Sequence, residues 1–274
     1  MLKEELTKIK ENNWIIPDEV NPYELSIKMM ENIGSLNSVL RDNLISSMFY
    51  RIIEDTKISH EQMKEILILC LSEKHLFYGI GKVKDDSVFN RTFSVLVIEG
   101  IISINNKSEK EFLSESEIKN TYKKVMDYFK KENDLRGYVE GKGWAHSTAH
   151  TSDALCSLAE SRYIKYEELM EILYIIKEKI CVTTYTYINE EDERLINTFM
   201  SVYNRQIISN DKIIDWIYSF KDINANGKYP DEEHLRENRK VFFRSLYFRA
   251  KKCNLEESII KSIDNVLNSI PTFY

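Results

Sequence analysis

The sequence is poor in proline, with 4 residues in 274, and the stretch between Tyr23 and Tyr229 has none. Proline in a helix interior costs about 3 kcal/mol relative to alanine, so this stretch permits long uninterrupted helices. The 4 cysteines are widely spaced and form no CxxC pair, which excludes the paired spacing of zinc and redox motifs. Each lies in or near an apolar helical pattern, so we expect buried free thiols and a reducing compartment.

The sequence also lacks an excess of positive charge: 38 Lys and Arg residues against 44 Asp and Glu residues give a net charge of −6. Because phosphate neutralisation supplies much of the affinity of nucleic-acid-binding proteins, we expect no nucleic-acid partner. No run approaches the ~18 apolar residues of a membrane span, and residues 1–14 are charged, unlike a signal peptide. We therefore expect a cytoplasmic protein without a membrane partner.

Hydrophobic residues make up 43% of the chain, and they recur with helical spacing. In residues 61–71 and 167–180 they occupy positions i, i+3, i+4 and i+7, which is typical of amphipathic helices. Ser59 and Ser114 each precede a Gln or Glu by three residues, which is the pattern of a capping box. These signals predict about a dozen helices, near residues 2–13, 22–33, 36–55, 59–73, 87–105, 115–132, 144–160, 165–181, 190–206, 209–221, 231–252 and 256–268.

Two segments resemble each other: residues 88–96 read VFNRTFSVL and residues 241–249 read VFFRSLYFR. Short helices with a recurring signature are typical of stacked helical pairs. We therefore expect an all-α fold, an α/α superhelix of the HEAT-like solenoid kind, in a single domain of residues 1–274. An irregular helical bundle is the alternative. Residues 181–188 have a strand-like composition but are short and isolated, so we expect a loop or a helix end there.

The most distinctive segment is residues 134–153, DLRGYVEGKGWAHSTAHTSD. It holds three of the 8 glycines, one of the 3 tryptophans and two of the 5 histidines. A helix beginning at Trp144 would advance 100° per residue and bring His146, His150 and Asp153 to one side. On the same geometry the Trp144 indole would face the opposite side. The segment therefore combines a glycine-rich loop with a polar helix face.

Two histidines four residues apart, with a carboxylate three residues further on, can hold a divalent metal and leave a coordination position open to water. The zincin motif needs Glu directly after the first histidine, where this chain has Ser147. Gly137, Gly141 and Lys142 do not form a P-loop, because the spacing is one residue short. The pattern leaves open a metal site, a site for a ligand without a metal, and a purely structural polar cluster.

Other residues are candidates for ligand contact. Tyr138 and Trp144, beside the glycines, could form an apolar wall of a pocket. Arg136 could contact a ligand, pair with a carboxylate on a neighbouring repeat or cover helix carbonyls. Arg91 and Arg244 occupy matching positions in the two similar segments, where they could line one concave surface or form salt bridges. The candidate ligand-binding residues are therefore Arg91, Arg136, Tyr138, Trp144, His146, His150, Asp153, Glu193 and Arg244, and the candidate metal ligands are His146, His150 and Asp153.

Four segments together resemble an uncharacterised bacterial family, the domain of unknown function 2785. The central segment is the specific one, since Gly-Trp-Ala-His followed by Ala-His and Asp rarely recurs by accident. The family pattern commonly has glycine between the second histidine and the aspartate, where this chain has Thr151-Ser152. The resemblance implies no activity, but it does imply that the four segments belong together: residues 86–96, 134–153, 191–195 and 242–249.

We expect a binding module that holds a small polar ligand or a peptide in a groove centred on the glycine-rich loop, His146, His150 and Asp153. The alternative from another class is a hydrolase in which these three residues hold a divalent metal, with Glu140 or Glu193 as the base. A third hypothesis is a purely structural interaction protein. The sequence names no substrate, catalytic residue, certain cofactor or oligomeric state.

Overall fold

The computed structural model describes residues 1–221, 223 and 227–271. In these ranges the chain forms twelve α-helices, one short π-helix and one two-stranded hairpin. The all-α class predicted from the sequence is confirmed, whereas the superhelical arrangement stays a prediction. The helices are α1 Leu2–Glu11, α2 Pro22–Glu31, η1 Val39–Ile45 (the π-helix), α3 Ser46–Glu54, α4 His60–Cys70, α5 Ser87–Lys107, α6 Glu115–Lys131, α7 Ser147–Glu160, α8 Tyr166–Ile180, α9 Glu191–Asn204, α10 Asn210–Tyr218, α11 Asp231–Lys252 and α12 Glu257–Ser269.

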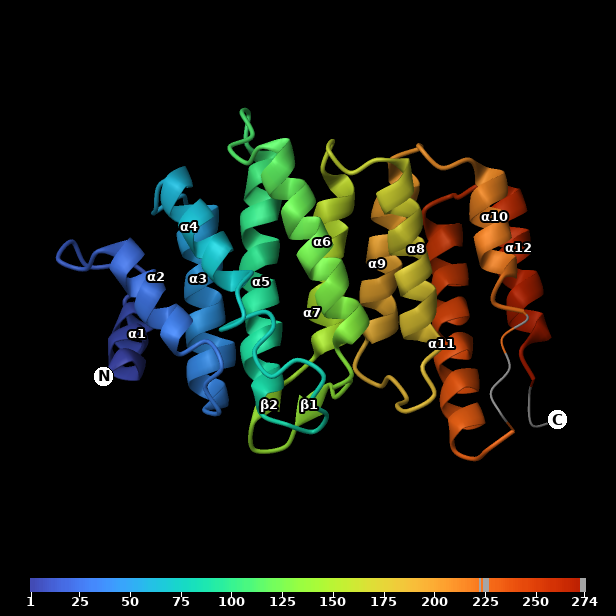
Figure 1. Cartoon of the computed structure of the whole chain (residues 1–274), viewed down its shortest axis with the longest axis horizontal. Helices are drawn as coiled ribbons and strands as arrows, with labels where there is room; N and C mark the ends of the chain where they lie inside the picture. Colours follow the sequence, from blue (N-terminus) through green and yellow to red (C-terminus); the bar gives the residue numbers. More distant parts are fainter. Residues whose placement is uncertain (222, 224–226, 272–274) are drawn as a thin grey trace. The chain divides into compact units, whose positions relative to one another are not determined.

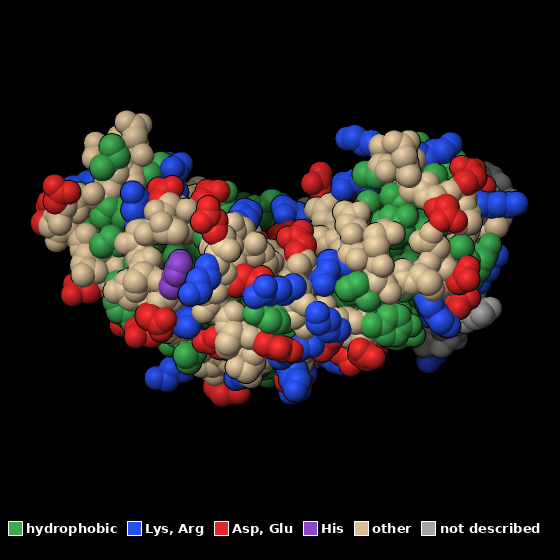
Figure 2. Space-filling view, turned by 90° about the horizontal axis from the view of Figure 1, so that it is seen from above, with side chains coloured by type: hydrophobic (Ala, Val, Ile, Leu, Met, Phe, Trp, Pro, Cys, Tyr) green, Lys and Arg blue, Asp and Glu red, His purple; other side chains and the backbone are tan. Residues whose placement is uncertain are grey.

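Contacts between residues divide the chain into two compact units, Met1–Tyr163 and Ile164–Tyr274. Unit 1 holds α1 to α7 and the hairpin, and unit 2 holds α8 to α12. The single domain expected from the sequence stays a prediction. Lys and Arg side chains are interspersed with Asp and Glu on the face shown in Figure 2, as the near balance of the two charges in the sequence leads one to expect.

Helix starts follow the local signals in the sequence. The Ser59 hydroxyl accepts the backbone N–H of Gln62, and the Gln62 side chain accepts the backbone N–H of Ser59. Ser114 and Glu117 form the same reciprocal pair at the start of α6. Each box satisfies two N–H groups that the first turn of a helix leaves without an intrahelical partner. Both predicted capping boxes are therefore confirmed.

α5 is the central helix of unit 1, with α7 packed along it and α3 and α4 in contact with it (Figure 1). By length and composition alone α5 could cross a membrane, but 67% of its apolar window is buried inside the protein. Burial of this kind is what a core helix requires. The expected cytoplasmic location stays a prediction.

The predicted helix over 144–160 begins later than expected. Tyr138–Val139 (β1) and Gly143–Trp144 (β2) pair as antiparallel strands, and α7 starts only at Ser147. Gly143 and His146 have φ angles of +84° and +48°, which an α-helix does not tolerate. The hairpin lies beside the start of α5 (Figure 1).

Unit 2 has an aromatic core. The Trp216 ring stacks on Phe199 with centroids 5.3 Å apart and meets Phe220 edge-on at 5.2 Å. The Trp216 indole donates to the carbonyl of Leu173 at 2.7 Å, so its one polar group is satisfied although the residue is buried. Phe220 in turn meets Phe243 edge-on. Contacts of this kind join α8, α9, α10 and α11 into one core.

The four cysteines are free thiols, but their burial differs from the expectation. Cys70 is buried and Cys181 is half-buried, and burial raises the pKa of both thiols, that of Cys181 to about 12. Cys156 is half-buried too. The prediction of burial was wrong for Cys253, which is exposed where α11 ends.

Residues 181–188 form a loop, as predicted, and Asn238 of α11 fixes it. The Asn238 side chain accepts the N–H of Tyr187 at 2.9 Å and donates to the carbonyl of Tyr185 at 2.9 Å. Asn238 is only 2% exposed, so water does not replace a lost bond without rearrangement of the loop.

We predict that Asn238→Ala lowers the free energy of unfolding by about 2–3 kcal/mol, because it leaves buried backbone groups of the loop without partners. Urea unfolding followed by circular dichroism measures the change. Asn204→Ala is the matched control, since Asn204 is exposed and should change stability by less than about 0.5 kcal/mol. Equal losses in the two variants would contradict the role assigned to Asn238.

Candidate functional site

The hairpin is attached to η1 by a buried arginine. Arg41 is 0% exposed, and its Nη2 donates to the carbonyl of Lys142 at 2.5 Å and pairs with Asp42 Oδ1 at 2.8 Å. Asp42 Oδ2 accepts the backbone N–H of Trp144 at 3.2 Å. The Arg41 guanidinium lies over the ring of Phe89, 4.1 Å from its centroid. Two consecutive residues of η1 therefore hold both sides of the hairpin turn.

Gly143 permits this attachment. A Cβ at residue 143 would collide with Asp42 Oδ2 and would come within 2.7 Å of Ser38 Cβ and 2.9 Å of Arg41 Nη2. The positive φ of Gly143 is also unfavourable for any residue with a side chain. Only glycine allows the hairpin backbone to approach η1 so closely.

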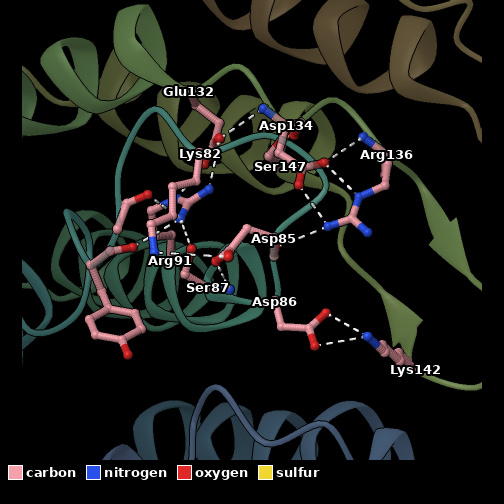
Figure 3. Close-up of polar contacts among 12 residues, drawn as sticks. Lys82, Asp85, Asp86, Ser87, Arg91, Glu132, Asp134, Arg136, Lys142 and Ser147 are labelled. Carbon is pink, nitrogen blue, oxygen red and sulfur yellow. Dashed lines mark hydrogen bonds and ion pairs between the residues drawn. The ribbon is translucent and has the colours of Figure 1, made fainter.

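A second set of polar contacts joins the hairpin to the start of α5 (Figure 3). Arg136 donates from Nε and Nη2 to the two carboxylate oxygens of Asp134 at 2.8 and 2.7 Å, and Nη2 also donates to the carbonyl of Asp85 at 3.0 Å. Hydrogen bonding to Asp134 raises the pKa of Arg136. Lys142 donates to both carboxylate oxygens of Asp86 at 2.8 Å. Arg136 thus pairs with a carboxylate two positions away in its own segment, and not with one on a neighbouring repeat.

Arg91 is part of the same framework. Its Nε and Nη2 donate to the carboxylate of Glu132 at 2.6 and 2.9 Å, and both residues are buried. Its Nη1 donates to the carbonyl of Tyr78 at 2.9 Å and to the hydroxyl of Ser87 at 2.8 Å (Figure 3). Burial alone would lower the pKa of Arg91, but the bonds to Glu132 outweigh it and raise that pKa. All three nitrogens of Arg91 thus bond to the protein, as in the salt-bridge alternative.

The sequence-predicted histidines form part of a continuous row of rings. Tyr138 meets Trp144 edge-on at 5.2 Å between centroids, and Trp144 stacks on His146 at 4.8 Å. His146 meets His150 edge-on at 5.5 Å, and His150 meets Phe93 of α5 at 5.4 Å. We call these five residues the aromatic–histidine row. The prediction that Trp144 faces away from the histidines was wrong, because Trp144 lies on a strand and its ring covers His146.

His146 is not on the helix either. It is the residue before α7 and has a left-handed backbone, so only His150 and Asp153 lie on α7 itself. The two imidazoles still meet, because the chain reverses at His146 and places its ring beside the first turn. Among the described residues no three His, Cys, Asp or Glu side chains gather as metal ligands would. The three-ligand set of His146, His150 and Asp153 is therefore not assembled.

Asp153 and the next turn of α7 face a carboxyl group that the sequence did not indicate. Ser157 donates from its hydroxyl to Glu99 Oε1 of α5 at 3.0 Å. Burial raises the pKa of Glu99, and the charges of Asp153 and Glu160 raise it further, whereas Ser157 and Lys107 lower it. Glu99 lies in the apolar stretch of α5 between residues 95 and 102, which the sequence pattern predicts to be core. A charged residue in such a helix was the signal that could have found it.

Two candidates lie in unit 2. Glu193 of α9 pairs with Arg249 Nη2 of α11 at 2.5 Å, and Arg249 also donates to Asn197 Oδ1 at 2.8 Å. Arg244 is exposed on α11. The expectation that Arg91 lines an open surface with Arg244 was wrong, because Arg91 is 0% exposed. The role of Glu193 or Glu140 as a base stays a prediction.

The sequence matches the family described as "Protein of unknown function (DUF2785)" over residues 76–248. The chain belongs to this family. The match covers the aromatic–histidine row, and of the four segments that carried the resemblance only Arg249 falls outside it. None of the curated proteins and none of the solved structures compared with the chain matches it. Membership of DUF2785 therefore confirms the resemblance and assigns no activity.

We predict that Gly143→Ala lowers the free energy of unfolding by at least about 3 kcal/mol, because the positive φ and the overlap with Asp42 add to each other. Gly141→Ala is the matched control. Gly141 also has a positive φ, +74°, but nothing lies within 4 Å of a Cβ there, so it should lose only about 1–2 kcal/mol. Similar losses in urea unfolding would show that the approach of the hairpin to η1 is not a constraint.

We predict that Glu99→Gln changes how stability depends on pH. Because the pKa of Glu99 is raised in the folded protein, the carboxyl group loses its proton more readily on unfolding. The contribution of Glu99 to stability therefore falls as pH rises from the ordinary value of 4.5 through the raised pKa. The melting temperature of Glu99→Gln should rise relative to wild type as pH increases above 4.5. The exposed Glu109→Gln is the control, and a constant difference between Glu99→Gln and wild type would refute the prediction.

Proposed function

We propose that the protein is a binding module that holds a small polar ligand or a peptide on the aromatic–histidine row. The observation that carries the proposal is the exposure of two large rings on a fixed support. Tyr138 is 57% exposed and Trp144 is 37% exposed, although both lie on a hairpin held by Arg41 and Asp42. Rigid aromatic side chains presented in this way contribute much of the binding energy in recognition sites, at a small cost in conformational entropy.

The row offers two kinds of contact to a ligand. The indole of Trp144 and the phenol of Tyr138 present apolar faces with a polar edge. His146 and His150 are half-buried beside them, and imidazole can donate or accept a hydrogen bond. A ligand with a flat or CH-rich face and adjacent polar groups matches this combination. A peptide side chain, a sugar and a nucleoside each have such a face, so the proposal covers small polar ligands and peptides.

The hydrolase hypothesis has less support, because its three metal ligands do not gather among the described residues. The structural hypothesis assigns the same residues a different role. It requires that Trp144 and the histidines matter only for packing, and the contact of His150 with Phe93 fits that role. The two hypotheses differ in what Trp144 does: a binding residue affects ligand affinity, whereas a packing residue affects only stability.

The test begins with a thermal-shift screen of N-acetylated amino-acid amides, methyl glycosides and nucleosides. Peptide ligands are selected separately from a random 12-residue library displayed on phage and are then synthesised for the same assay. Ligands that stabilise the wild type are then titrated by calorimetry. We expect Trp144→Ala to weaken binding at least about fivefold, since stacking of a planar group on an aromatic ring contributes about 1–3 kcal/mol. Trp144→Phe keeps a ring and should recover part of the affinity.

Tyr174→Ala is the control, because Tyr174 is 53% exposed on α8 in unit 2 and lies outside the row. It should leave affinity unchanged. Absence of any ligand, or equal affinity of the wild type and Trp144→Ala for every ligand found, would refute the proposal. A lower melting temperature of Trp144→Ala with unchanged affinity would favour the structural hypothesis.

A further inference from the structure

Unit 1 contains a large cavity that does not include the aromatic–histidine row. It is open to solvent and its volume is about 1100 Å³, slightly above the range of about 300–1,000 Å³ that is usual for small-molecule sites. The end of α2 and the loop after it form one side, the segment between α4 and α5 forms another, and Lys142 of the hairpin closes part of the rim. The first turn of α5, with Ser87 and Asn90, lies between these segments.

The cavity walls are held in place. A Cβ at Gly34 would come within 2.8 Å of Asn90 Cβ, so the loop after α2 lies directly against α5. Asn90 also donates to the carbonyl of Lys74 at 3.0 Å, and its Oδ1 lies 3.3 Å from His75 Nδ1. On the other wall Arg91 donates to the carbonyls of Tyr78 and Gly79. A ligand would therefore meet a preformed site.

The lining is divided by chemistry. Ile27, Met30, Ile33, Leu36 and Leu69 give it an apolar wall. Tyr78, which is 52% exposed, adds an aromatic ring. Four lysines lie on the segments between α4 and α5 and on the hairpin: Lys74, Lys82, Lys84 and Lys142.

Two of these lysines, Lys142 and Lys82, lie close to carboxylates, and the other two do not. Lys142 pairs with Asp86 at 2.8 Å, and Lys82 lies 3.9 Å from Asp85. Within the described ranges neither Lys74 nor Lys84 forms an ion pair or a side-chain hydrogen bond. Their ammonium groups are available to an anion in the cavity, and a lysine is an effective point charge for phosphate.

We propose that this cavity binds a soluble phosphate monoester with an aromatic or apolar body, its phosphate between Lys74 and Lys84 and its body against the apolar wall. Burial lowers the pKa of His75, so its imidazole is a neutral hydrogen-bonding group there. Glu31 also lines the cavity, and its negative charge repels an anion. Removal of this charge should therefore strengthen binding. This inference goes beyond the proposed function, because it concerns other residues and another ligand.

The experiment titrates phenyl phosphate into the protein by calorimetry, with inorganic phosphate and phenol as the separate halves of the probe. We expect saturable binding of phenyl phosphate that is tighter than that of either half and weaker at high salt. Lys74→Gln and Lys84→Asn should each weaken it about fivefold, since each removes one charged contact. Asparagine suits residue 84, because the backbone there has a φ of +57°. Glu31→Gln should strengthen binding.

Lys57→Gln is the matched control, because this substitution removes the same charge. Lys57 is exposed and lies outside the cavity lining. Lys74→Arg keeps the charge and should retain most of the affinity. The proposal is overturned if phenyl phosphate does not bind at millimolar concentration, or if Lys57→Gln weakens binding as much as the cavity variants do. It is also overturned if the protein instead sediments with phosphatidylcholine vesicles containing phosphatidic acid, which would place the phosphate on a membrane.

Discussion

The buried guanidinium of Arg41 is the contact on which the site in unit 1 depends. A buried charge is tolerated only when it is paired and hydrogen-bonded, and Arg41 meets this requirement through Asp42, the carbonyl of Lys142 and the ring of Phe89. Burial still lowers the pKa of Arg41 and raises that of Asp42. The hairpin cannot move away from η1 without breaking the hydrogen bonds that Arg41 and Asp42 make to its backbone. The positions of Gly143 and Trp144 therefore follow from Arg41 and Asp42.

The helices could be predicted from sequence because their signals are local. The capping boxes at Ser59 and Ser114 and the apolar stripes need only a few neighbouring residues. The hairpin could not be predicted in this way. Trp144 has no β signal strong enough to oppose a helix, and the turn is imposed by Asp42, which is 102 positions away in the sequence. The left-handed backbone of His146 has the same origin, since it joins a strand fixed by η1 to a helix packed on α5.

The candidate site was found in part. Tyr138, Trp144, His146 and His150 were singled out because rare residues cluster in the sequence, and the structure brings their rings together. The partners of the charged residues around them were missed because they come from distant segments: Glu132 lies 41 positions from Arg91, and Ser157 lies 58 positions from Glu99. A more careful use of one signal could have found some of them. Arg41 and Glu99 are charged residues among apolar helical neighbours, and such residues need a partner inside the protein.

The charged groups at the hairpin are mostly paired within the protein, whereas two of its aromatic rings are exposed. Arg41, Arg91, Arg136 and Lys142 each bond to a carboxylate of the protein, so their charges stabilise the framework and are not available to a ligand. The groups that this framework leaves accessible are the rings of Tyr138 and Trp144 and, across the cavity lining, the ammonium groups of Lys74 and Lys84. A high density of charge around the glycine-rich loop therefore reflects how the loop is attached. In the proposed function the ligand contacts come from the less polar residues that the attachment holds at the surface.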